Sequence, residues 1–268
     1  MKRFFIVCAF ISAIIAKGVN AEDEIAFDNP KKLDDTIVVT ANRRATPIAE
    51  VASSITILTE DDIANAQVHM VSDLLRSVPG TDVVQSGGPG KTVSVFLRGA
   101  GSHHTLVIID GIEMNDPATA SSSFDFAHLN LDDIQRVEIL RGPQSVLYGS
   151  DALGGVINIL TKRGIGKPKI ELNSEVGAYK TFKESLLING SKDKIDYSFN
   201  LFRKDVEGFS SIKSDNENPE KDGYKNSYFS SNLGWQLSNS VYFSFSGFSL
   251  PDLIDENPST SFLNKLKE

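Results

Sequence analysis

Residues 141–163 read RGPQSVLYGSDALGGVINILTKR, and this stretch carries more structural signals than any other part of the chain. Pro143 stands where the proline of a first helical turn belongs, and Gly149 is placed to end the same helix. The Gly-Gly pair at 154–155 predicts a backbone kink before the apolar strand that follows. The stretch therefore predicts a short helix between two strands.

Upstream of this stretch, short strands alternate with short helices. Thr59 and Asp62 have the spacing of a capping box at a helix start, and Pro79-Gly80 is a helix stop. The expected strands are 54–58, 82–85, 93–97, 106–110 and 136–140, and the expected helical segments are 60–65, 71–77 and 131–134. Residues 42–165 are therefore expected to form one compact α+β domain.

After residue 165 the pattern changes to antiparallel strand candidates of ~10 residues. They begin near residues 169, 183, 194, 227 and 240. In one of them Tyr197 and Phe199 alternate with Ser198 and Asn200. One apolar and one polar face over this length is typical of transmembrane β-barrel strands. The alternative is a soluble antiparallel sheet with one wet face.

The N-terminus has the features of an export signal. Lys2 and Arg3 precede an apolar run at 4–16, and residues 19–21 offer a small-residue cleavage site. The run is shorter than the ~18–20 residues that a spanning helix needs, so a cleaved signal over 1–21 is expected rather than a membrane anchor. The only cysteine, Cys8, lies in this signal, which leaves none for disulfides or metal sites.

Charge and motif searches exclude several functions. The net charge of −8 argues against nucleic acid, because such binding depends on lysine and arginine neutralising phosphates. Gly90-Lys91-Thr92 has Gln85 where a phosphate-binding loop needs glycine, and a strand is expected to follow. His103-His104 are adjacent and are interpreted as a surface turn. Because no nucleophile, base and acid come together, no enzyme activity and no required cofactor are expected.

Two polar segments are candidate binding sites. The loop at 205–222 is rich in carboxylates and amides, which are ligands for Ca²⁺, although a solvated acidic loop explains the same composition. Behind a polar lead, residues 35–41 read DTIVVTA. This β-branched run suits either a short strand of the protein's own or a segment that pairs with the sheet edge of another protein.

Several segments, in this order, resemble the TonB-dependent outer-membrane receptors of Gram-negative bacteria. They are DTIVVTA (35–41), DLLRSVPG (73–80), FLRG (96–99), LVIIDG (106–111) and VEILRGPQSVLYGSDALGGVINI (137–159). The resemblance implies a signal peptide at 1–21, a periplasmic lead at 22–41, a plug domain at 42–165 and the first strands of a barrel at 166–268. Receptors of this kind close about 22 strands around the plug.

The resemblance also implies a partner and a mechanism. The segment 35–41 corresponds to the TonB box, which pairs as a strand with periplasmic TonB and transmits work that opens a path through the plug. A proline in this box should abolish coupling, because pairing uses main-chain donors. The expected box residues are Asp35, Thr36, Ile37, Val38, Val39, Thr40 and Ala41.

Within the family, the sequence looks most like the cobalamin receptors, with ferric-siderophore or haem receptors as the alternative. The matching ligand contacts are Thr92, Ser94, Thr119 and Ala120, whereas Gly101 replaces a contacting asparagine. Glu220 and Asp222 match calcium ligands, but Ser210 replaces a third.

The resemblance further assigns Arg98 and Arg141 to ion pairs with barrel glutamates; the alternative is that both are solvated surface arginines.

Five strands cannot close a barrel that holds a plug. The chain is therefore expected to be the front part of a receptor, in contact with outer-membrane lipid and not competent for transport alone. A soluble periplasmic binding or interaction module is the alternative of another class.

Overall fold

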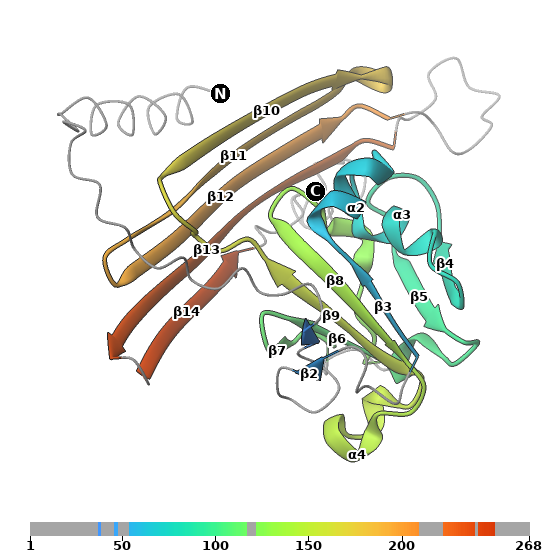
Figure 1. The fold of residues 1–268 in the computed structure, drawn as a ribbon. Coiled ribbons are helices and arrows are strands. Elements are labelled where there is room, and N and C mark those ends of the chain that lie inside the picture. Colours follow the sequence, from blue (N-terminus) through green and yellow to red (C-terminus); the bar gives the residue numbers. More distant parts are fainter. Residues whose placement is uncertain are drawn as a thin grey trace, which may run out of the picture. The chain divides into compact units, whose positions relative to one another are not determined.

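The computed structural model describes residues 37–38, 46–47, 54–116, 122–208, 222–238 and 241–249. Within them, an α+β domain (54–161) is followed by an antiparallel sheet, here called the C-terminal sheet (Figure 1). The fold class predicted from the sequence is thereby confirmed.

One mixed sheet, here called the core sheet, organises the α+β domain. Its strand order is β3-β8-β9-β6-β7, and only β6 and β9 run parallel. Its strands are β3 (Ser54–Leu58), β6 (Thr105–Ile109), β7 (Ile112–Glu113), β8 (Ile134–Arg141) and β9 (Gly155–Thr161). Asp110 and Gly111, both with positive φ, form the two-residue turn that joins β6 to β7.

Two smaller sheets lie outside the core sheet. They pair β4 (Thr81–Gln85) with β5 (Val93–Leu97), and β1 (Ile37–Val38) with β2 (Thr46–Pro47). The strands predicted at 54–58 and 93–97 are found with the predicted limits.

Three α-helices belong to the α+β domain: α2 (Glu60–Ala66), α3 (Val71–Arg76) and α4 (Ser145–Tyr148). The predicted capping box of α2 is present, with the Asp62 amide donating to Thr59 Oγ1 and the Thr59 amide donating to the Asp62 carboxylate. The Thr59 amide and the Thr59 hydroxyl both donate to the Asp62 carboxylate, and these two bonds lower the pKa of the Asp62 carboxyl. The 3₁₀ turns are η2 (Ser102–His104), η3 (Phe126–His128), η4 (Ser150–Ala152) and η5 (Ala178–Lys180).

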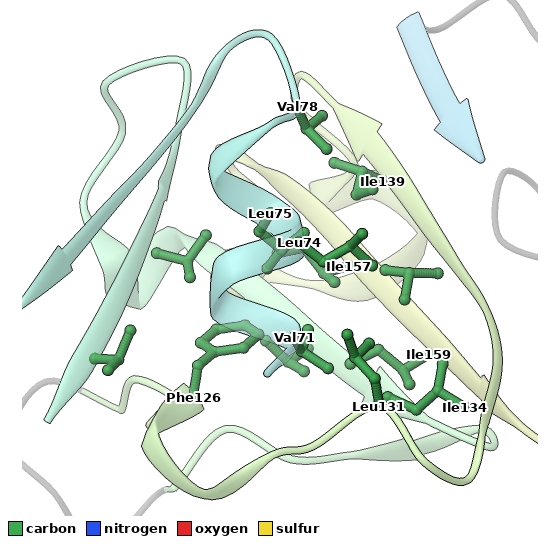
Figure 2. Close-up of a cluster of buried hydrophobic side chains, with 14 of the residues drawn as sticks. Val71, Leu74, Leu75, Val78, Phe126, Leu131, Ile134, Ile139, Ile157 and Ile159 are labelled. Atoms are coloured by element: carbon green, nitrogen blue, oxygen red, sulfur yellow. The ribbon is translucent and has the colours of Figure 1, made fainter. Parts of the chain in front are cut away.

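Helix α3 covers one face of the core sheet. Val71, Leu74, Leu75 and Val78 recur at helical spacing and are at most 4% exposed. Figure 2 shows these side chains directed toward the isoleucines of β8 and β9. The alternating residues of the two strands supply the other half of this core: Val137, Ile139, Ile157 and Ile159.

The Gly-Gly pair allows β9 to lie close to its neighbours. Gly155 has φ +151°, and a Cβ there would lie 2.2 Å from the carbonyl oxygen of Leu140 and 2.8 Å from Leu97 Cδ1. Any side chain at this position would therefore push β9 away from β8 at the point where the ladder begins. This close packing explains why glycine stands at position 155.

Two sequence predictions for the α+β domain are wrong. Pro143 precedes the N-cap residue Gln144 and so lies outside α4 rather than in its first turn. Residues 131–133 form a turn closed by the Ile134 amide and the Leu131 carbonyl, after which β8 begins. The ladder that Ile134 enters with β9 takes precedence over the helical tendency of this segment.

The C-terminal sheet is an antiparallel meander of five strands in sequence order (Figure 1). They are β10 (Lys169–Gly177), β11 (Thr181–Lys192), β12 (Ile195–Val206), β13 (Tyr224–Ser238) and β14 (Val241–Ser249). In the described residues β10 and β14 are its edges, so the sheet does not close on itself.

The two faces of the C-terminal sheet have the reverse of the polarity found in soluble sheets. Asn200, Asn226 and Ser230 are buried, at 8% exposure or less, whereas Trp235 and Phe243 are 53% and 58% exposed. Other exposed apolar side chains on its strands are Ile170, Leu172, Val176, Ile195, Leu233, Val241 and Phe245. A soluble sheet would bury its apolar face, so this pattern favours the barrel interpretation. No helix in the described part of the chain is long and apolar enough to cross a membrane.

Candidate ligand and partner sites

The glycine-rich segment predicted to contact ligand is the loop between β4 and β5. The Ser86 amide donates to the Thr92 carbonyl and the Lys91 amide donates to the Gly88 carbonyl, which closes the loop (86–92). Thr92 is exposed, and Ser94 is half-buried opposite Val84. The other two predicted contacts, Thr119 and Ala120, lie outside the described residues.

The turn η3 lies beneath this loop and was not singled out from the sequence. Asp125 Oδ1 accepts hydrogen bonds from the amides of Val93 and Ala127, both at 2.9 Å. His128 Nδ1 lies 3.1 Å from the Tyr224 hydroxyl, and the two rings are stacked with centroids 5.7 Å apart. Burial lowers the pKa of the His128 imidazole, and the charge of Asp125 raises it by less.

A buried polar cluster joins the α+β domain to the C-terminal sheet. Asp133 Oδ2 accepts a hydrogen bond from Ser230 Oγ at 2.6 Å, and Asp133 Oδ1 lies 3.0 Å from the Tyr228 hydroxyl. That hydroxyl is also 2.7 Å from Asn130 Oδ1 and accepts from Asn200 Nδ2. Burial raises the pKa of the Asp133 carboxyl, which the hydrogen bonds from Ser230 and Tyr228 only partly offset.

Sequence reasoning identified the alternation in β12 and β13 but not the partners of the polar residues. The available signal was their chemistry, since Ser198 and Asn200 of β12, and Asn226, Ser230 and Asn232 of β13, share the two-residue period of one face. That period predicts one polar face. It does not predict that the face is buried against residues that lie about a hundred positions away.

Acidic and basic side chains also meet at this interface. Lys183 Nζ lies 3.0 Å from Asp132 Oδ1, and both side chains are at most 16% exposed. His69 Nε2 lies 3.3 Å from Glu175 Oε1 in a half-exposed pair. Because the Lys183 pair is largely removed from water, we expect that removing one partner costs more stability than at a surface ion pair, since the other charge would be left buried and unpaired.

The two predicted plug arginines have different surroundings. Arg141 is 9% exposed and donates from Nη1 to the Pro79 carbonyl and from Nη2 to Thr56 Oγ1, both at 2.7 Å. Burial lowers its pKa, and the nearby charge of Arg98 lowers it further. Arg98 is exposed. In the part of the chain that the structure describes, neither guanidinium forms an ion pair, so pairing with a glutamate stays a prediction.

The TonB-box segment is described only in part. Ile37 and Val38 form β1, which pairs antiparallel with Thr46 and Pro47 of β2 and is not joined to the core sheet. The remaining box residues lie outside the described part of the chain: Asp35, Thr36, Val39, Thr40 and Ala41. Within the described part of the chain, β2 is the only strand that pairs with these two residues.

The calcium prediction is untested. Glu220 and Ser210 lie outside the described residues, whereas Asp222 is described and half-buried. Among the described residues, no three histidine, cysteine, aspartate or glutamate side chains form a group that could hold a metal ion. Ca²⁺ at 205–222 remains a prediction from the resemblance.

Residues 47–156 match the protein family described as TonB-dependent Receptor Plug Domain. This part of the chain has the fold of a TonB-dependent receptor plug domain. The matched residues contain the whole α+β domain except residues 157–161, which are most of β9. The loop 86–92, the turn η3 and the arginines at 98 and 141 are therefore all parts of the plug.

The plug and the strands after it are also similar to solved receptor structures. The pyoverdine outer membrane receptor of Pseudomonas aeruginosa PAO1 matches with a TM-score of 0.66 and 19% identity, over 82% of this chain and 31% of that one. The ferric yersiniabactin uptake receptor of Yersinia pestis matches with a TM-score of 0.58 and 22% identity, over 73% and 31%. A siderophore receptor of Acinetobacter baumannii matches with 0.57 and 23%, over 72% and 31%.

The chain spans about a third of the length of each of these structures. At these identities the likeness concerns the fold. A plug followed by antiparallel strands is thus shown, and the identity of the ligand is not.

Proposed function

We propose that this chain is part of a TonB-dependent outer-membrane receptor in which β10–β14 are strands of the barrel around the plug. One observation carries the proposal. The C-terminal sheet buries its polar face against the plug and exposes its apolar face, as a strand wall between a protein-filled lumen and lipid would. With the export signal expected at 1–21, the location follows as the outer membrane of a Gram-negative cell.

The proposed partner is the periplasmic domain of TonB. The two box residues that the structure describes, Ile37 and Val38, pair with β2, and Pro47 of β2 has no amide proton to give to the ladder. A competing strand from TonB would therefore replace a weak pairing. Residues 42–53 connect the box to β3, which is an edge strand of the core sheet, so tension on the box reaches the plug at a strand with one neighbour.

Two ligand classes have separate support. The solved structures favour a ferric siderophore, because receptors for such compounds share this fold. The residue-level resemblance at Thr92, Ser94, Thr119 and Ala120 favours cobalamin. A haem receptor would share the plug markers as well. All are large, scarce, metal-containing nutrients, and none requires chemistry by the protein, so we propose transport rather than catalysis.

Two further elements belong to the same proposal. Arg98, exposed and near Arg141, is the better candidate for an ion pair with a barrel glutamate, because Arg141 already donates to Pro79 and Thr56. Glu220 and Asp222 are proposed to bind Ca²⁺ in the 205–222 loop. A soluble periplasmic module is disfavoured, because it would leave the apolar face of the C-terminal sheet in water.

TonB pairing is tested by titrating the 268-residue chain in detergent micelles with the TonB C-terminal domain. Ile37→Pro should abolish binding, because it removes a ladder donor. Ile37→Val, which keeps the amide and a β-branched side chain, should bind like the unmodified chain. Equal affinity of the proline variant and the unmodified chain would show that the box does not act by strand pairing.

The ligand class is tested separately by equilibrium binding of cyanocobalamin and ferric pyoverdine to the same preparation. Saturable binding of one compound and not the other assigns the class. If neither compound binds, the ligand proposal fails. The TonB titration would still decide whether TonB is the partner.

A further inference from the structure

The turn η3 and its N-cap residue Asp125 contact two other parts of the molecule at once. Asp125 fixes the first residue of β5, directly after the loop 86–92, through the Val93 amide. On the other side, Asn226 Nδ2 donates to the His128 carbonyl at 3.1 Å, and the Tyr224 hydroxyl lies 3.4 Å from the Ala127 carbonyl. η3 therefore connects the loop of the plug to the first residues of β13.

Phe126 anchors the turn between these contacts. Its side chain is 2% exposed and belongs to the plug core (Figure 2). It also packs edge-to-face on Phe124, with ring centroids 4.8 Å apart. Because interiors of this kind are close-packed, the turn cannot shift without moving core side chains. The plug thus offers a rigid base at this position.

The ring of Tyr224 lies directly against the loop 86–92. A Cβ on Gly90 would lie 2.3 Å from Tyr224 Cδ2 and 2.7 Å from Cε2, so the loop backbone contacts this ring as closely as glycine permits. The imidazole of His128 stacks on the same ring with an interplanar angle of 17°. Tyr224 is only 7% exposed, because the loop and η3 cover it.

We propose that Tyr224 and His128 are positioning residues that set the position of the loop 86–92 and hence of the binding surface that carries Thr92 and Ser94. The surface is then completed by β13 and is not a property of the plug alone. The role as a ligand surface rests on the proposed function, whereas the positioning of the loop rests on the contacts above. A space-filling role for Tyr224 without effect on the loop is the alternative.

The contact is tested by hydrogen exchange in the 268-residue chain in detergent micelles. Gly90→Ala should speed amide exchange in residues 86–92 about tenfold, because its new methyl group collides with the Tyr224 ring. Gly88→Ala is the matched control in the same loop, since nothing lies within 4 Å of its added Cβ, and it should leave exchange unchanged. Amides of β8 and β9 report in the same experiment whether each variant is folded.

Gly90 also has a positive φ of +80°, so strain and collision must be separated. Gly99→Ala introduces comparable strain at φ +75° with no atom within 4 Å, and should not affect residues 86–92. In a Tyr224→Ala background the collision is gone, so Gly90→Ala should add little further exchange. An equal effect of Gly90→Ala in both backgrounds would overturn the proposal.

The ring and the hydroxyl of Tyr224 have separable roles. Tyr224→Phe keeps the ring against Gly90 and should preserve protection of the loop, whereas Tyr224→Ala should remove it. With cyanocobalamin or ferric pyoverdine as the probe, Tyr224→Ala should weaken binding about tenfold while exchange in β8 and β9 stays unchanged. If neither probe binds the unmodified chain, the ligand class fails, and the exchange data alone still confirm or refute the positioning role.

Discussion

Asp133 is the residue whose charge state should affect the stability of the interface most. Burial raises its pKa above the ordinary 3.8, so its contribution to stability is complete below that value and is lost as pH rises through the folded-state pKa. Asp133→Asn does not titrate and keeps an amide within reach of Ser230 and Tyr228. We expect the unmodified chain to lose unfolding free energy relative to this variant from acidic to neutral pH. Urea unfolding across that range measures the difference, and parallel pH curves would contradict it.

Individual residues were predictable where their partners are close in sequence. The capping box of Thr59 and Asp62 needs only a three-residue spacing, and the structure contains both of its hydrogen bonds. Arg141 differs, because its acceptors are the Pro79 carbonyl and Thr56, which are 62 and 85 positions away. No local pattern specifies such partners.

At the scale of the element, we expect Arg141 to stabilise the position of β3 at the edge of the core sheet. Among the described strands this edge strand pairs only with β8, and the Arg141 guanidinium donates both to its Thr56 and to the Pro79 carbonyl. Arg141→Met keeps much of the apolar stem but removes both bonds, each worth about 1.5–3 kcal/mol when the donor is charged. Relative to the unmodified chain, we expect this variant to speed amide hydrogen exchange in β3 more than in β9.

Thr56→Val is the control for this prediction. It removes one acceptor and keeps the β-branched shape, so the loss of β3 protection should be smaller than with Arg141→Met. If exchange of the β3 amides is unchanged in both variants, strand pairing alone stabilises β3. The Arg141 hydrogen bonds would then offer no resistance to a pull on the chain that precedes this strand.

Elements were predicted well where a pattern and a turn agreed. The strand at 54–58 and the strand at 93–97 have the predicted limits, and Asp110-Gly111 marks the end of β6. The long C-terminal strands were expected at ~10 residues, but β13 has 15. Their true length reflects pairing along the whole ladder with β12, which is a property of the sheet and not of one segment.

At the scale of the whole molecule, the sequence predicted two faces for the C-terminal sheet but left open which face is buried. The alternation of Ser198 and Asn200 with Tyr197 and Phe199 is the same for a soluble sheet and for a barrel wall. Only the contacts of the polar face with the plug decide between them, as in the bond from Asn232 Nδ2 to Thr161 Oγ1 at 2.6 Å.

Trp235, the only tryptophan, can report whether the exposed face meets lipid. It is 53% exposed and lies between Ile195 and Phe243 across the ladder. In micelles of a brominated detergent we expect its fluorescence to be strongly quenched, while iodide in the aqueous phase should quench it little, because apolar chains cover this face.

The matched control combines Trp235→Phe with Val146→Trp, which moves the indole to a plug position that is 97% exposed. That variant should show the opposite order, with strong quenching by iodide and weak quenching by bromine. Iodide quenching of Trp235 as strong as that of the control would place the apolar face in water and would remove the basis for a barrel wall.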